Sequence, residues 1–175
     1  MFAAHLAVGL AIKSAQPKAP TAAVLTGAFL PDLFWIAFAG GGIEPAGDAV
    51  FFDGWSHSAA SIVVQAVLFA LCFYSRGRAV AVAVGLAVLS HLPLDALIHP
   101  QPLELWPHAS LLLGHPNWSW AQTPLALNKS RYWWIQLATV LPLLAFYAAR
   151  AAKHEVPINL VAASCIFVIG LHLIL

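Results

Sequence analysis

Two histidines and an aspartate recur at four-residue spacing in an apolar stretch of this chain. His91, Asp95 and His99 lie in the segment Ser90–Pro100, which closes an apolar run that begins at Ala79. Residues four apart share one face of a helix, so we expect His91 and Asp95 to point the same way, as do Asp95 and His99. An ionisable side chain in hydrocarbon costs about 3 kcal/mol and marks a functional site.

Other apolar segments contribute further polar groups that could complete a site with this pair. They are His5 near the start of the chain, Asp32 within a long apolar run and His57 just before the next one. Imidazole and carboxylate ligands without cysteine suit zinc or another divalent metal. The sequence therefore predicts a metal site with the ligands His5, Asp32, His57, His91 and Asp95.

His99 is not equivalent to His91 in this prediction. The two lie about 12 Å apart along an ideal helix, too far to share one ion whose ligand bonds are about 2 Å long. Either His91 and Asp95 bind one metal while His99 supports them, or Asp95 bridges two ions. A plain structural reading also stands for each group. His–Asp pairs join helices, Asp32 can cap backbone groups freed by Pro31, and a lone histidine can be a packing residue.

Composition places the chain in a membrane. Of its 175 residues 61% are hydrophobic and 9% are charged, and the mean hydropathy is +0.83, whereas soluble domains carry about 25% charge. A net charge of +1 leaves no electrostatic footprint for nucleic acid. Cys72 and Cys165 both fall in apolar runs and predict no disulfide framework. We expect one membrane-embedded domain over residues 1–175.

Apolar runs predict an all-α, polytopic transmembrane bundle. A short N-terminal helix from Phe2 toward Pro17 is followed by about five long helices. Their expected ranges are Thr21–Gly40, Ser58–Ser75, Ala79–Ile98, Trp133–Ala149 and Ile158–Leu175. Pro31 predicts a kink in the first long helix, and Ser56 is a candidate N-cap for the second.

Positive charges predict which ends of the helices face inward. Lysines and arginines cluster in alternate loops, which we place inside by the positive-inside rule. The acidic loop before Ser56 and the segment 100–132 then lie outside, where we expect an interfacial or re-entrant piece around Ala109 to Leu113. In this topology, all five predicted ligands reach the outer half of the bundle.

Four motifs follow one another along about the first two thirds of the chain. They are Met1-Phe2-Ala3-Ala4-His5-Leu6-Ala7-Val8-Gly9, Leu30-Pro31-Asp32, Trp55-Ser56-His57-Ser58 and the run from Ser90 to Pro100, which is followed by Leu105-Trp106-Pro107. In this order they resemble the motifs of the bacterial predicted membrane-bound metal-dependent hydrolase family (YdjM-like), in a multi-span branch.

The resemblance implies a multi-pass protein of the bacterial inner membrane with the five predicted ligands as metal-site positions. It names no substrate. The chain also departs from many relatives, which have a second acidic residue where this chain has Phe34 and His-Arg-Gly where it has Phe52-Asp53-Gly54. These departures remove groups that could bind an anionic substrate or a second metal.

These residues are compatible with three functions. The first is a zinc-type hydrolase that acts on an ester, phosphoester or amide at the outer headgroup level, and its substrate could be a membrane lipid. In it, Asp32 or His99 accepts a proton or orients water. The second is a transporter or metal/proton conduit, and the third is a non-catalytic protein whose His–Asp cluster ties helices together. The sequence does not determine the oligomeric state.

Overall fold

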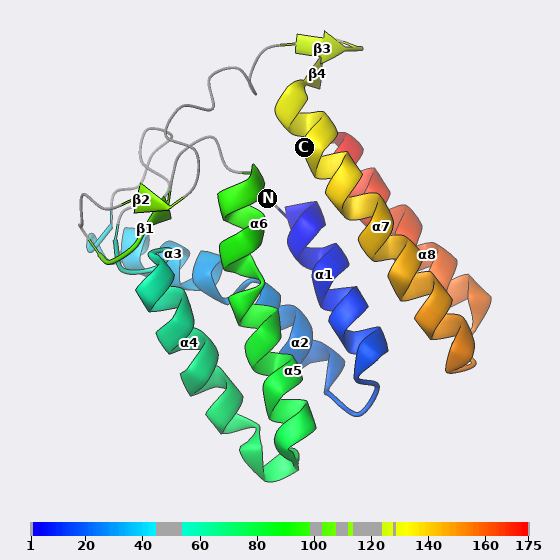
Figure 1. The fold of residues 1–175 in the computed structure, drawn as a ribbon, viewed down its shortest axis with the longest axis horizontal. Coiled ribbons are helices and arrows are strands. Elements are labelled where there is room, and N and C mark those ends of the chain that lie inside the picture. Colours follow the sequence, from blue (N-terminus) through cyan, green and yellow to red (C-terminus); the bar gives the residue numbers. More distant parts are fainter. Residues whose placement is uncertain are drawn as a thin grey trace.

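The computed structural model describes residues 2–44, 54–98, 103–107, 112–113, 124–127 and 129–174, and most of these residues are helical. The helices lie side by side as a bundle (Figure 1). In chain order they are α1 (Phe2–Ala15), α2 (Thr21–Ala28), α3 (Leu30–Gly40), α4 (Ala59–Cys72), α5 (Arg78–Leu89), α6 (His91–Ile98), α7 (Arg131–Lys153) and α8 (Ile158–Ile174), with a 3-10 turn at Tyr74–Arg76.

Two antiparallel strand pairs accompany the helices. Strand β1 (Leu103–Glu104) pairs with β2 (Leu112–Leu113), and β3 (Pro124–Ala126) pairs with β4 (Lys129–Ser130). The backbone N–H of Ala60 donates to the carbonyl of Leu105 at 3.1 Å, which ties the segment after β1 to the start of α4. Of the predicted re-entrant piece, Leu112 and Leu113 form β2, and residues 109–111 lie outside the described residues.

Fewer helices are long enough to cross a membrane than the five expected. By length and composition, Arg78–Leu97 and Arg131–Lys153 qualify, and α2 with α3 makes a third if the bent pair is one span. Helix α4 has 14 residues and α8 has 17, short of the roughly 20 that a span needs. The expectation failed because these two apolar runs form α-helices of only 14 and 17 residues, and the run after Ser58 passes into a 3-10 turn at Tyr74.

Proline accounts for both breaks that matter to the predicted ligands. Helices α2 and α3 meet at a 59° bend, with Pro31 in the first turn of α3, so the predicted kink is confirmed. Pro93 follows the break between α5 and α6 at Ser90. A proline has no N–H and its ring clashes with the carbonyl four residues earlier, so a continuous helix is disfavoured at both places.

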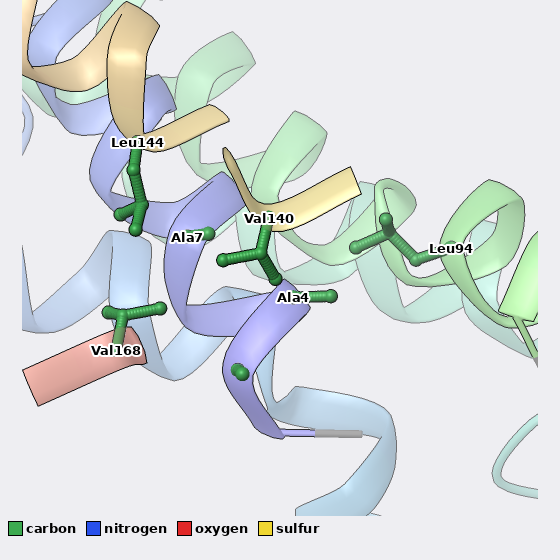
Figure 2. Packing of buried hydrophobic residues seen from close by; sticks show 7 residues of the cluster. Ala4, Ala7, Leu94, Val140, Leu144 and Val168 are labelled. Atoms are coloured by element: carbon green, nitrogen blue, oxygen red, sulfur yellow. The ribbon is translucent and has the colours of Figure 1, made fainter. Parts of the chain in front are cut away.

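The main core forms where α1 meets α6, α7 and α8. Figure 2 shows Val140 and Leu144 of α7 beside Ala4 and Ala7 of α1, with Leu94 of α6 and Val168 of α8 completing the cluster. Alanines on α1 let the neighbouring helices approach its backbone closely. The first residues of α1 are therefore held against α6 and α7, at the end of the bundle where α4 and α7 also begin (Figure 1).

A second core joins α2 to α5. Val24 and Val84 are fully buried within it, and Gly27 lies against α5 at the point of closest approach. A Cβ atom at Gly27 would lie 3.2 Å from the carbonyl oxygen of Val84 and 3.3 Å from Ala87. This packing places the end of α2, and hence the start of α3, next to the end of α5.

Candidate metal centre

Five side chains from four segments converge at this end of the bundle. His5 comes from α1, Asp32 from the first turn of α3, His57 from the turn before α4, and His91 and Asp95 from α6. His5, His57, His91 and Asp95 are each no more than 3% exposed. The structure thus brings together all five residues that the sequence predicted as ligands.

Neighbouring ring and carboxylate atoms are spaced as two ligands of one ion would be. Asp95 lies between two rings, with His5 Nε2 3.3 Å from Oδ1 and His91 Nε2 3.1 Å from Oδ2. Asp32 Oδ1 is 3.5 Å from His57 Nε2 and 3.8 Å from His91 Nε2. Two ligand atoms about 2.1 Å from a tetrahedral zinc are about 3.4 Å apart, and the four distances bracket that value.

His91 presents a nitrogen lone pair to both carboxylates. Its Nδ1 lies 3.0 Å from the carbonyl oxygen of Ala28. Because a carbonyl can only accept, Nδ1 carries the hydrogen, and in a neutral ring Nε2 then carries the lone pair. Metal-binding histidines are held in this way, with the other ring nitrogen donating to a backbone carbonyl.

His57 has the same tautomer as His91, and a chain of hydrogen bonds that begins at Glu44 fixes it. The Glu44 carboxylate accepts the Ser56 backbone N–H and the Ser56 hydroxyl, each at 2.7 Å. The Ser56 hydroxyl has one hydrogen and gives it to Glu44, so its oxygen accepts from His57 Nδ1 at 2.8 Å. His57 Nε2 therefore faces Asp32 with its lone pair when the ring is neutral.

Contacts within the cluster leave polar atoms unused. His91 Nε2 and Asp95 Oδ2 are 3.1 Å apart, yet neither makes a hydrogen bond of acceptable geometry among the described residues, and neither does His5 Nε2. Two lone pairs that face each other at this distance repel unless a proton or a cation lies between them. Buried polar groups without partners are costly, so atoms arranged in this way indicate a place where a proton or a cation binds.

Charge balance favours a divalent cation. Every ion pair that Asp32 and Asp95 make within the described ranges is with a histidine. With neutral rings, the cluster carries two negative charges in a largely buried position, which one divalent ion would neutralise. Two sets of three residues meet the spacing for an ion, and they share His91: His5, Asp32 and His91, and also His57, His91 and Asp95. These buried groups can hold a metal ion.

Asp32 is the most accessible member of the cluster. Its side chain is 25% exposed, whereas the side chains of His5, His91 and Asp95 are at most 3% exposed. A small molecule or water would therefore reach the cluster from the side of Asp32. An accessible carboxylate beside buried imidazoles suits proton transfer at the open face of a metal site.

Other predicted residues lie elsewhere. His99 lies outside the described residues, so its role as a proton acceptor stays a prediction. Ser56 does not cap α4, because its hydroxyl bonds to Glu44. The N-cap is Ser58, whose side chain accepts from the Ser61 N–H at 3.3 Å.

Sequence reasoning missed Glu44 and the role of Ser56. Ser56 is next to His57 in the chain, so the pattern contained a signal for it. Glu44 lies 12 residues before Ser56 in an acidic loop, and no spacing rule singles it out.

Comparisons with protein-family models, curated proteins and solved structures find no match to this chain. The resemblance to the YdjM-like family therefore remains a prediction from its motifs, and the function is argued from the site.

Proposed function

We propose that this chain is a multi-pass protein of the bacterial inner membrane, of the YdjM-like kind, with a metal-dependent hydrolase site in the outer half of its bundle. Apolar composition and two helices of spanning length support the membrane location. The single observation that carries the site is the convergence of three imidazoles and two carboxylates with ligand-like spacing.

A zinc-type ion is the proposed cofactor, because neutral imidazole and carboxylate are its ligands in hydrolytic sites. His57, His91 and Asp95 would hold it, with His5 or Asp32 completing the shell. Such an ion, when bound, activates water as a nucleophile near neutral pH. The carbonyl of Ala28 and the Glu44–Ser56 pair keep His91 and His57 oriented for this role.

Asp32 is the proposed proton acceptor. It is the accessible carboxylate of the cluster, and its Oδ1 faces the Nε2 atoms of His57 and His91. The bond cleaved would be an ester, phosphoester or amide that reaches the outer headgroup level. His99 remains a second candidate for the same proton.

Metal analysis of the purified protein tests this proposal. The wild type, reconstituted with zinc and washed, is expected to hold stoichiometric zinc, whereas His91→Ala and Asp95→Ala lose most of it. His154→Ala is the matched control, because His154 is an exposed histidine at the end of α7. Wild-type protein without stoichiometric metal, or His91→Ala with as much as the wild type, would overturn the site.

A hydrolysis assay distinguishes an enzyme from a protein in which the cluster only ties helices together. Asp32→Asn keeps the size of the side chain and removes the base. With His5 completing the shell, we expect this variant to retain metal and to lose hydrolysis of ester and phosphoester lipids. If the cluster only ties helices together, His91→Ala with Asp95→Leu would lower thermal stability and change nothing else. A transporter would instead show metal-dependent flux in proteoliposomes.

A further inference from the structure

An apolar groove runs along the outside of the bundle between α3 and α4. Phe34 and Phe38 line it from α3, and Val64 and Leu68 line it from α4. Each pair is four residues apart and so lies along one helix face. The groove has a volume of about 340 Å³, within the roughly 300–1,000 Å³ of ordinary ligand pockets.

The groove extends along α4. The lining residues of α4 extend from Ala60 to Leu68, which is about 12 Å along a helix axis. Trp55 and Trp106 line the groove together with them. Trp55 directly precedes the turn into α4, and the Leu105 carbonyl bonds to Ala60, so both tryptophans lie at the end where α4 begins. Tryptophan at one end of an apolar surface is typical of the headgroup level of a membrane.

That same end adjoins the metal centre. Gln65, which lines the groove, donates its side-chain amide to the carbonyl of Ser56 at 2.8 Å. Ser56 bonds to His57 Nδ1. A single hydrogen bond therefore links the groove wall to the segment that carries the predicted ligand His57.

We propose that this groove holds one acyl chain of a membrane lipid and places the lipid's headgroup linkage at the metal centre. The inference rests on the proposed function and names its substrate class. An acyl chain is extended and apolar, as is the groove along α4. The groove has the volume of a small-ligand pocket.

Two polar side chains on the wall bond to the chain itself, although the buried Oε1 of Gln65 has no hydrogen-bond partner among the described residues. The Ser61 hydroxyl accepts from Ser58 at 2.9 Å, and the Gln65 amide is bonded to Ser56. Phe34 is 38% exposed, Val64 54% and Leu68 59%. The groove thus offers apolar contact at its wall, which fits a hydrocarbon chain.

Photolabelling in nanodiscs tests this inference. The full chain is placed in discs of phosphatidylethanolamine and phosphatidylglycerol that contain a phosphatidylethanolamine with a diazirine near the end of one acyl chain. We expect cross-links to concentrate on peptides containing Phe38 and Leu68. Equal labelling of exposed apolar residues elsewhere, such as Leu71 and Ile166, would overturn the groove, as would cross-links showing a second copy of the chain seated in it.

Two neighbouring valines on α4 provide a matched pair of variants. Val64→Trp fills the groove and is expected to lower labelling there several-fold. Val63→Trp, at a position 45% exposed that does not line the groove, is expected to leave it unchanged. Equal labelling in the two variants would contradict the inference. The wild-type labelling pattern decides the question if either variant fails to fold.

Metal content measured in the same samples separates this inference from the proposed function. If wild-type protein holds no stoichiometric metal but is still labelled in the groove, the proposed metal centre is wrong and the proposed acyl-chain site is supported. If it holds stoichiometric metal but labelling shows no preference for the groove, only the acyl-chain site is wrong.

Discussion

The imidazole rings of His5 and His91 lie stacked at the centre of the cluster, with centroids 3.9 Å apart and planes 1° from parallel. The Asp95 carboxylate faces both rings, one through each oxygen. Two protonated rings at this distance would repel each other, so at most one of the two is protonated. The stack therefore keeps at least one ring neutral, and a neutral imidazole is the form that binds a metal.

His5 is expected to hold His91 and Asp95 in place for the ion. His5→Ala removes the stack and a potential ligand, so affinity for zinc should fall by at least about tenfold. Competition with a chelator of known affinity measures this. His172→Ala is the control, because His172 is also buried and stacks on Trp133 outside the cluster. Equal losses in both variants would contradict the assignment.

Glu44 is expected to act through Ser56 on the orientation of His57. Glu44→Gln keeps the shape of the side chain but removes the carboxylate that accepts the Ser56 hydroxyl. We expect zinc affinity to fall about 10- to 100-fold while the protein stays folded. Glu155→Gln, at an exposed glutamate, should have no effect. Unchanged zinc affinity in Glu44→Gln would show that the hydrogen bonds from Glu44 through Ser56 to His57 do not affect zinc binding.

Pro93 is expected to position the ligands of α6 by breaking the helix before it. Pro93→Ala restores an N–H that can bond to the carbonyl of Leu89, so a continuous helix becomes favourable. The interruption at Ser90 would close and His91 and Asp95 would turn relative to α5, so metal content should fall although every ligand is present. Pro142→Ala, within α7, should keep full metal content. Full metal content in Pro93→Ala would contradict this prediction.

Gly27 is expected to set the distance between α2 and α5. A larger side chain would meet Val84, Ala87 and Val88 at 3.2 to 3.3 Å from its Cβ, so Gly27→Leu should lower the free energy of unfolding by about 1–3 kcal/mol. Thermal unfolding in detergent measures it. Gly170→Leu is the control, since a Cβ at Gly170 meets nothing within 4 Å. Equal unfolding free energies in Gly27→Leu and Gly170→Leu would show that α2 and α5 can move apart without loss of stability.

Spacing along the chain was informative wherever one helix was concerned. Because a helix repeats every 3.6 residues, the sequence alone placed His91 and Asp95 on one face. Because proline cannot donate a backbone hydrogen bond, it also predicted the kink at Pro31, which the structure has as a 59° bend. The short N-terminal helix was equally clear and ends at Ala15.

Helix lengths were less predictable, because apolar composition does not report where a helix ends. The run from Ser58 to Ser75 reads as one span, but the α-helix begins at Ala59 and ends at Cys72. The sequence predicted Ser56 as the N-cap, and this was wrong. Ser58 caps the helix, and the Ser56 hydroxyl bonds instead to Glu44, 12 residues earlier in the chain.

The sequence by itself determined which residue types could bind a metal and which of them share a helix face. Only the tertiary structure decided which imidazole meets which carboxylate, that Ala28 and Glu44 orient the rings, and that Asp32 is the accessible member. The reason is physical. Periodicity governs positions within a helix, whereas distances between helices depend on packing at contacts such as Gly27 against Val84, between residues far apart in the chain.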